Sequence, residues 1–386
     1  MTPINSWLTN TLRPYFGLHS VEEHWDTIEI KNGYFICMDG DIIRKRISVS
    51  EQAYQETDVE IPTRNREVIL PQTARGKEKK MNYTHISSIK ANGVIFSAGM
   101  RTEDLPSSYI IARNTKTFFE LPLTNTKNLT SKEEIVEWLH RYPSKLPTDY
   151  NLKLNKLTSK KSLRYKAVPG DIFRVEIDLF TDGYVLVIGD LRQMQKDGLF
   201  AEDSLWNNVM TMPLFIRPYL FKTTKRLPSM EDITSTPLSE QTLIVMDDHF
   251  MRGGYEKVGH KTLTETDILL PLGYGISIDY GKEERYRLSW GTGTISKSEQ
   301  ETSFKTISRF SNYGVHAGIA IESFDTDRGQ AFSLNNPLSA KERKQALAEF
   351  GFPEDITYDE FNRQTGGLTR SEYLDYLSNK YPRSRK

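Results

Sequence analysis

The sequence predicts an α+β protein that is rich in β structure. Two mainly antiparallel β domains are joined by a helix and a basic linker, and a small helical appendage follows. Most apolar residues occur in short aromatic and β-branched segments between Gly, Asn, Asp and Pro, a pattern typical of antiparallel strands. A length of 386 residues is also sufficient for two hydrophobic cores. We therefore expect a β-rich domain with a terminal helix at 1–143, a linker at 144–167, a second β-rich domain at 168–337 and a helical tail at 338–386.

The N-terminal part is predicted to form a sheet followed by one helix. Strand-like segments lie at residues 33–41, 66–73, 91–100, 107–114 and 116–123. Ser131 and Glu134 have the spacing of a capping box, and apolar residues follow on one helical face, which predicts a helix that Pro143 ends. Residues 144–167 are rich in lysine and poor in large apolar residues, as is typical of an exposed connection between domains.

The second domain is predicted to begin with a pair of antiparallel strands between Gly170 and Leu191. Phe173, Val175 and Ile177 alternate with charged residues, so one face of the first strand is expected to pack on a core. Residues 181–183, Thr-Asp-Gly, are expected to turn the chain into a buried central strand. Further strands are expected at 213–222, 242–248, 274–280, 286–291 and 318–324.

Capping-box spacings predict the remaining helices. Ser298 with Glu301, followed by Gly314, predicts a helix inside the second domain. Three more Ser/Thr–Glu pairs predict the helices of the tail: Ser339 with Glu342, Thr357 with Glu360, and Thr369 with Glu372.

Residues 247–263, "DDHFMRGGYEKVGHKTL", concentrate histidine and aspartate around a Gly-Gly pair. The segment is predicted to be a β-hairpin with its reversal at Arg252-Gly253-Gly254. His249 and His260 would then lie near the same open end, with two aspartates nearby. One hairpin does not supply three ligands of secure geometry, so structural histidines are favoured over a metal site, and no metal or other cofactor is expected.

Composition limits the classes of partner. The 51 basic and 51 acidic residues cancel, which disfavours the whole chain as an electrostatic trap for nucleic acid. Two basic segments, 75–80 and 153–166, are interpreted as a solvated hairpin tip and a solubilising linker. The single cysteine, Cys37, excludes an intramolecular disulfide, the N-terminus has no secretory signal, and no apolar run is long enough to span a bilayer. A cytoplasmic protein without a membrane partner is expected.

Residues from about 165 to 275 resemble the immunity protein 26 family of bacterial polymorphic-toxin systems. The resemblance rests on "YKAVPGDIFRVEIDLFTDGYVLVIGD", on "PLFIRPYLF" and on "HFMRGGYEKVGHKTLTETDILLPLGYG". It implies a non-catalytic cytoplasmic protein that binds and blocks a cognate toxin. Its structural motif would comprise Gly170, Asp171, Phe173, Gly259 and His260.

Three functions follow from these observations: a toxin inhibitor, a metal-dependent hydrolase that uses His249 and His260, and a nucleic-acid-binding module. The inhibitor is favoured because the resemblance implies it, and the lack of a recognisable catalytic motif agrees with it. An inhibitory surface requires aromatic and arginine side chains, which carry most of the binding energy at interfaces. The side chains expected to contact the toxin are Trp206, Arg217, Tyr219, Phe250, Arg252 and Tyr255.

Overall fold

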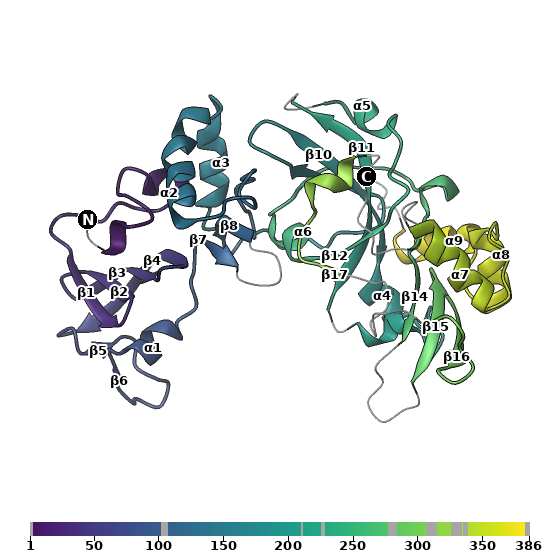
Figure 1. Cartoon of the computed structure of the whole chain (residues 1–386), viewed down its shortest axis with the longest axis horizontal. Coiled ribbons are helices and arrows are strands. Elements are labelled where there is room, and N and C mark those ends of the chain that lie inside the picture. The colour runs from purple at the N-terminus through teal and green to yellow at the C-terminus, as the bar shows by residue number, and fades with distance from the viewer. Residues whose placement is uncertain are drawn as a thin grey trace. The chain divides into compact units, whose positions relative to one another are not determined.

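The computed structural model describes residues 3–101, 107–209, 211–224, 228–276, 284–305, 315–325, 334 and 339–382. The predicted class is confirmed, since the strands form three sheets and short helices accompany them (Figure 1). The chain forms two compact units. Unit 1 comprises Met1–Arg164, Asp178–Phe180 and Arg252–Gly254, and unit 2 comprises Tyr165–Ile177, Thr181–Met251 and Tyr255–Lys386.

Unit 1 is built on one antiparallel sheet in which strands adjacent in sequence mostly pair with each other. Its strands are β1 (Asp26–Lys31), β2 (Tyr34–Asp39), β3 (Ile42–Val49), β4 (Ala53–Arg64), β5 (Val68–Ile69), β6 (Lys79–Lys80), β7 (Val94–Arg101) and β8 (Ser107–Asn114). The strand predicted at 116–123 is wrong: this segment makes only an isolated bridge between Arg113 and Glu120. Phe118 has a φ of +60°, which interrupts an extended backbone.

The helices of unit 1 are α1 (Tyr83–Ser87), α2 (Lys132–Arg141), α3 (Tyr150–Leu157) and the 3₁₀ turns η1 (Pro3–Asn5), η2 (Arg13–Phe16) and η3 (Tyr142–Lys145). The start of α2 is confirmed, because the Ser131 side chain accepts from the amide of Glu134. The segment 144–167, expected to be an exposed connection, instead contains α3. Tyr150 and Leu157 are buried in the core of unit 1, so this part of the segment belongs to the domain.

A charged cluster is buried in unit 1, which composition alone did not indicate. The side chains of Arg13, Lys45 and Glu56 are fully buried. Arg13 Nε lies 2.9 Å and Lys45 Nζ 2.7 Å from Glu56 Oε1, so one carboxylate joins η2 to strands β3 and β4. Pairing of this kind is required because an isolated buried charge is strongly unfavourable.

Unit 2 contains a six-stranded sheet in the order β13-β9-β10-β11-β12-β17 and a three-stranded sheet in the order β14-β15-β16. The strands are β9 (Asp171–Glu176), β10 (Asp182–Asp190), β11 (Pro213–Thr223), β12 (Leu243–Met246), β13 (Glu256–His260), β14 (Leu272–Ile276), β15 (Arg285–Trp290), β16 (Gly293–Ser298) and β17 (Val315–His316). The antiparallel pair predicted between Gly170 and Leu191 is confirmed. The turn lies earlier than expected, because Asp182 already pairs with Glu176.

The two faces of the six-stranded sheet pack on separate cores. Phe173, Val175 and Ile177 face one core, as predicted, whereas Ile172 faces the other. The other helical elements of unit 2 are α4 (Leu191–Lys196), α5 (Met230–Thr234), α6 (Asp248–Arg252, of which Arg252 belongs to unit 1) and the 3₁₀ turns η4 (Leu205–Asn208), η5 (Glu265–Asp267) and η6 (Ile321–Phe324). The strand expected at 318–324 is wrong, since residues 321–324 form η6.

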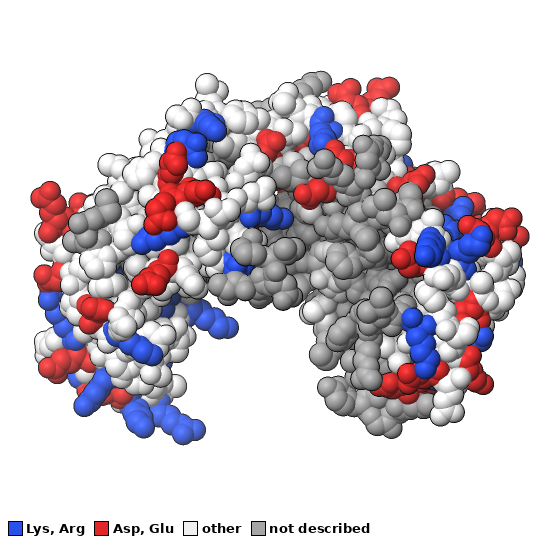
Figure 2. Space-filling view, in the orientation of Figure 1, with Lys and Arg blue, Asp and Glu red and all other residues white. Residues whose placement is uncertain are grey.

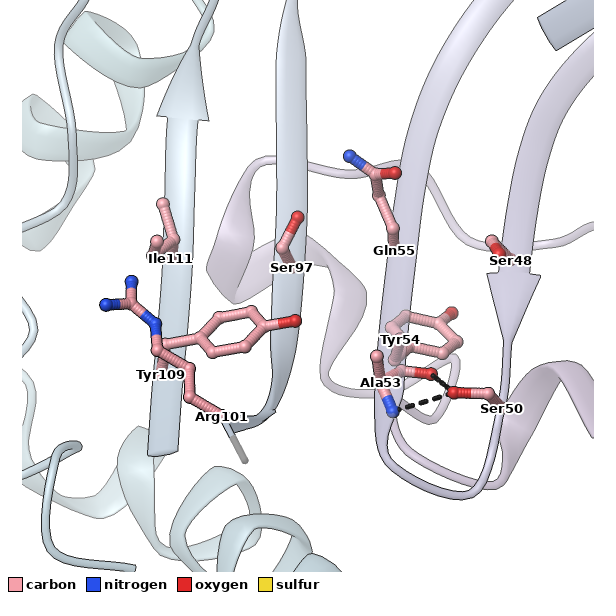
Figure 3. Close-up of a pocket in the computed structure, with 9 residues that line it drawn as sticks. All are labelled: Ser48, Ser50, Ala53, Tyr54, Gln55, Ser97, Arg101, Tyr109 and Ile111. Carbon is pink, nitrogen blue, oxygen red and sulfur yellow. Dashed lines mark hydrogen bonds between the residues drawn. The ribbon is translucent and has the colours of Figure 1, made fainter. Parts of the chain in front are cut away.

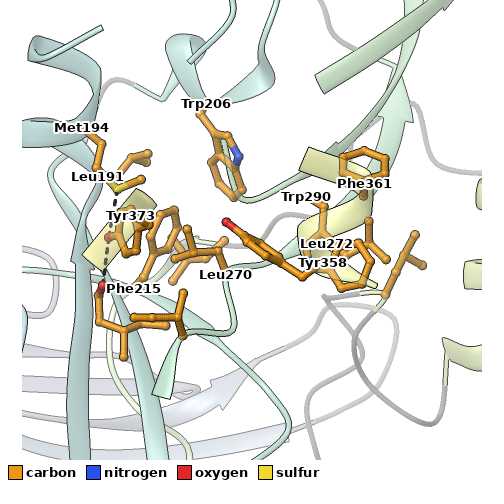
Figure 4. Close-up of a cluster of buried hydrophobic side chains, with 14 of the residues drawn as sticks. Leu191, Met194, Trp206, Phe215, Leu270, Leu272, Trp290, Tyr358, Phe361 and Tyr373 are labelled. Atoms are coloured by element: carbon orange, nitrogen blue, oxygen red, sulfur yellow. Dashed lines mark hydrogen bonds between the residues drawn. The ribbon is translucent and has the colours of Figure 1, made fainter. Parts of the chain in front are cut away.

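The C-terminal helices are part of the core of unit 2. They are α7 (Ala340–Glu349), α8 (Tyr358–Thr365) and α9 (Arg370–Lys380). The hydroxyl of Tyr373 donates to the carbonyl of Ile188 in β10 at 2.9 Å, and Trp290 packs edge-on against Tyr358 (Figure 4). The capping boxes of α8 and α9 are confirmed, whereas Ser339 makes no side-chain cap on α7.

The helix predicted at 298–314 is wrong over residues 298–305, and residues 306–314 lie outside the described part of the chain. Ser298 and Glu301 do exchange hydrogen bonds, but strand β16 ends at Ser298 and only a turn follows. The amides of Ser303 and Phe304 donate to the Glu349 carboxylate, so they do not bond to carbonyls one helical turn earlier.

Candidate functional site around Asp171

The predicted hairpin at 247–263 is wrong, and the two histidines do not face each other. Strands β12 and β13 belong to the same sheet, but β9, β10 and β11 lie between them. His249 lies in α6 and stacks on the Tyr255 ring, with centroids 4.8 Å apart and planes 19° apart. His260 ends β13, which pairs with β9. The chain forms a helix after β12 and then adds β13 to the far edge of the sheet.

The last residue of β13 completes a polar network centred on Asp171. The Asp171 carboxylate is fully buried. Its Oδ1 lies 2.9 Å from Nδ1 of His260 and 2.8 Å from Nζ of Lys257. Its Oδ2 accepts from the hydroxyl of Tyr165 at 2.6 Å and from the amide of Val168 at 3.0 Å. Both carboxylate oxygens are therefore satisfied without access to water.

A β-bulge in β13 brings Lys257 and His260 to the same carboxylate. In a regular strand, residues three positions apart point to opposite faces of the sheet. Lys257 pairs with Phe173, Gly259 with Ile172 and His260 with Asp171, so two residues of β13 advance against one of β9. The extra residue shifts the alternation of side chains by one position. The side chains of Lys257 and His260 therefore both lie on the face that carries Asp171.

Two glycines allow close packing around this network. Gly170 has a φ of +98°, and a Cβ there would lie 2.5 Å from the carbonyl oxygen of Lys261 and 2.6 Å from Cε1 of His260. At Gly259, a Cβ would meet Sδ of Met230 at 2.4 Å. A side chain at position 170 would therefore displace the imidazole of His260 from Asp171.

The network changes the titration of two of its members. Burial acts to lower the pKa of Lys257, but hydrogen bonds to Asp171 and Tyr165 outweigh it and raise the pKa above the usual lysine value. The pKa of Tyr165 is also raised, chiefly by burial and then by its hydrogen bond to Asp171. Both shifts favour the protonated forms.

The site shares one feature with catalytic sites, an imidazole oriented by a buried carboxylate. The side chain of His260 is 48% exposed, and the buried Asp171 orients it through Nδ1. Carboxylate-oriented imidazoles act as bases where a nucleophile is within reach. Among the described residues no hydroxyl or thiol is hydrogen-bonded to His260, and no group of three His, Cys, Asp or Glu side chains is placed to hold a metal. The contacts of the described residues show the network joining β13 to β9.

Most of the side chains predicted to contact a partner are core residues. Trp206 is fully buried, and its indole nitrogen donates to the carbonyl of Gly291 at 3.0 Å. Arg217 donates to the carbonyls of Ser239, Thr266 and Asp267, and burial lowers its pKa to about 10. Tyr219 and Phe250 are each 1% exposed. Their size and polarity serve the fold, and they offer no surface to a partner.

Arg252 and Tyr255 are only partly buried. Arg252 belongs to unit 1, where its guanidinium carbon lies 4.6 Å from the centroid of the Phe118 ring. Tyr255 belongs to unit 2, packs against Phe250 and accepts a hydrogen bond from the amide of Ile319 at 3.1 Å. These two are the partly exposed members of the predicted contact set.

Sequence reasoning identified Gly170, Asp171, Phe173, Gly259 and His260 as a motif but missed Tyr165 and Lys257. Both lie inside the segments that carry the family resemblance. Lys257 was assigned to a hairpin strand facing β12, and the bulge that redirects it leaves no pattern in the sequence. Tyr165 was read as the end of the linker, although its hydroxyl donates to Asp171.

A second feature is a shallow pocket of about 400 Å³ on the sheet of unit 1 (Figure 3). Strands β3, β4, β7 and β8 and the turn after β3 contribute the residues that line it: Ser48, Ser50, Ala53, Tyr54, Gln55, Ser97, Arg101, Tyr109 and Ile111. The phenol of Tyr109 lies over β7, the strand that carries Ser97 (Figure 3). Apart from Arg101, the polar groups are uncharged hydroxyls and an amide.

Comparison with known proteins gives one match. Residues 168–284 match the family described as Immunity protein 26. The matched segment contains the Gly170-Asp171 and Gly259-His260 pairs of the network. No curated protein and no solved structure matches the chain. No helix in the described ranges has the length and apolar character that crossing a bilayer requires.

Proposed function

From the match of residues 168–284 to the immunity protein 26 family, we infer that this chain is an immunity protein. It binds a cognate bacterial toxin in the cytoplasm and blocks it stoichiometrically, without catalysis. One observation in particular supports a dedicated site in this segment. The two motifs that carry the resemblance, Gly170-Asp171 and Gly259-His260, are remote in sequence but meet in one hydrogen-bonded network.

The proposed recognition surface is the edge of the sheet at β13. Lys257 and His260 are 37% and 48% exposed, and the buried Asp171 fixes both. Pre-ordered side chains lose less conformational entropy on binding, which favours affinity. Tyr255 lies directly before β13 and remains a candidate for this surface, whereas Arg252 belongs to unit 1 and remains a separate candidate. The polar character of this edge suits a partner that presents carboxylates or backbone carbonyls.

The function is tested with the toxin encoded beside this gene. The toxin is expressed from an inducible promoter with and without the immunity chain, and growth is measured. A catalytically inactive toxin is then used to measure Kd by calorimetry with the purified full-length chain. We expect restored growth and a 1:1 complex. Growth arrest despite soluble immunity chain, together with no measurable complex, would refute the proposal.

The surface is tested with Lys257→Met, which removes the ammonium group, and His260→Gln, which removes the imidazole; both change the side-chain volume little. We expect a Kd at least tenfold higher for each, because interface side chains at such sites contribute more than about 1.4 kcal/mol. Lys196→Met, at an exposed position on α4, is the matched control and should bind as the wild type does. Wild-type affinity in both test variants would exclude the β13 edge while leaving the immunity function intact.

A further inference from the structure

A basic segment of unit 1 continues its sheet beyond β4, where β5 pairs with both β4 and β6. It comprises residues 64–80, from the last residue of β4 through β5 and β6, and is called here the basic finger. Lys and Arg side chains gather over this hairpin at the lower left of Figure 2, where Figure 1 labels β5 and β6. The finger lies outside the segment that matches the immunity family. The match therefore assigns no role to the finger.

The net charge of the whole chain is zero, but its two parts carry opposite net charges. Residues 1–164 contain 24 Lys and Arg against 19 Asp and Glu, whereas residues 165–386 contain 27 against 32. The finger alone contains six basic and two acidic residues. It therefore supplies four of the five excess positive charges of residues 1–164. The expectation that nucleic acid is a disfavoured partner rests on the net charge of the whole chain, in which these two opposite charges cancel.

The finger has more cations than its own acids can neutralise. Arg64 pairs with Glu78, and Arg66 lies 2.7 Å from Asp26 of β1. For the other four cations, Arg75, Lys77, Lys79 and Lys80, the structure shows no ion pair within its described residues. Arg75, Lys77 and Lys80 are exposed, and Lys79 is half-buried.

The backbone distributes this charge along the returning segment of the hairpin. Residues 78–80 run back along the hairpin, with Lys79 opposite Ile69 and Lys80 opposite Val68. Side chains alternate along an extended segment, and Glu78 is directed to Arg64. Lys79 therefore lies on the face of Ile69 and Lys80 on the opposite face, while Lys77 lies in the exposed segment before β6, so the hairpin carries cations on both faces.

We propose that the basic finger binds the phosphate backbone of double-stranded nucleic acid without sequence preference. Lysine and arginine neutralise phosphates and release condensed counterions, which is the main source of nonspecific affinity. The finger contains no aromatic residue on which unpaired bases could stack, so single strands gain nothing over a duplex. An acidic protein surface would offer the same charge, and the comparison with poly-L-glutamate below distinguishes it from a duplex.

The test measures the fluorescence anisotropy of a labelled 20-base-pair DNA duplex of arbitrary sequence, titrated with the full-length chain at 50, 100 and 200 mM NaCl. Four phosphate contacts predict a slope of log affinity against log salt of about −3.6, so affinity falls about 100-fold over this range. A second duplex of unrelated sequence should bind within a factor of two. Absence of binding at 50 mM NaCl would refute the proposal.

The decisive variant replaces Arg75, Lys77, Lys79 and Lys80 with glutamine. We expect at least a 30-fold loss of affinity at 50 mM NaCl and a slope near zero, with unchanged thermal unfolding. The matched control replaces four exposed lysines of unit 1 outside the finger, Lys127, Lys145, Lys160 and Lys161, and should bind nearly as the wild type does. Equal losses in the two variants would show a diffuse charge effect. Tighter binding of poly-L-glutamate than of duplex would indicate an acidic protein partner. Either result overturns the assignment.

Discussion

Asp171 and His260 are separated by 89 residues in the chain, yet Oδ1 of one and Nδ1 of the other lie 2.9 Å apart. The carboxylate is inaccessible to solvent and the imidazole is half exposed. The aspartate thereby fixes the orientation of a histidine at the surface. The pair also fastens the edge strand β13 to β9, so the local fold and the proposed recognition surface depend on the same contact.

Asp171→Asn should destabilise the protein by about 2 to 4 kcal/mol. The substitution keeps the shape of the side chain but removes the charge that pairs with Lys257 and His260, and loss of one partner of a buried pair is costly. Urea denaturation at pH 7 measures the change. Glu202→Gln neutralises an exposed acid of the same unit and should change stability by less than about 0.5 kcal/mol. Equal stability of the two variants would mean that the network contributes nothing to folding.

Gly170→Ala should cost about 3 kcal/mol, because the new Cβ would require both a φ of +98° and displacement of the Lys261 carbonyl. Gly198→Ala is the matched control. Gly198 also has a positive φ, +69°, but no atom lies within 4 Å of its Cβ position, so we expect about 1 kcal/mol. Thermal unfolding of both variants measures the difference. If Gly170→Ala is no worse than the control, the close approach of His260 is not maintained in solution.

Local patterns were sufficient to predict much of the fold. Alternation predicted the pair β9–β10, and Ser/Thr–Glu spacing predicted the start of α2, α8 and α9. The same spacing failed at Ser298, because Glu349, far away in sequence, takes the amides that a helix would need. Whether a capping signal starts a helix depends on contacts that only the folded chain makes.

The candidate site could likewise be predicted only in part. The Gly170-Asp171 and Gly259-His260 motifs were recognisable, but their meeting depends on strand order. β13 follows β12 after a short helix and was read as its hairpin partner; it pairs with β9 instead. The size and polarity of the aromatic and arginine residues predict contact residues. Burial of Trp206 and Arg217 is a tertiary property, which composition does not reveal.

Arg217→Met should destabilise unit 2 by about 3 kcal/mol or more and should affect toxin binding only through folding. The guanidinium donates four hydrogen bonds to three backbone carbonyls, and its loss leaves buried acceptors unsatisfied. Arg192→Met, at an exposed position on α4, is the control and should be nearly neutral. Urea denaturation and calorimetry with toxin separate the effects. A stable Arg217→Met protein that no longer binds toxin would restore Arg217 as a recognition residue.

Glu349 should make the stability of unit 2 depend on acid pH. Burial acts to raise its pKa, but hydrogen bonds from Ser303, Phe304 and Lys297 outweigh burial and lower the pKa from its ordinary 4.5 to about 2. The folded state therefore holds the carboxylate ionised where the unfolded state would protonate it. The resulting stabilisation, about 3 kcal/mol, is complete above pH 4.5 and is lost as the pH falls from about 4.5 to 2.

Glu349→Gln removes this dependence. Urea denaturation of the wild type and the variant at pH 7, 4.5, 3 and 2 should show the variant less stable by about 3 kcal/mol at pH 7, with the difference shrinking toward zero at pH 2. Glu342→Gln, at an exposed position near the start of the same helix, should follow the wild type throughout. A difference that persists unchanged at pH 2 would indicate that Glu349 acts through packing or neutral hydrogen bonds, because protonation of the wild-type side chain would then have removed nothing.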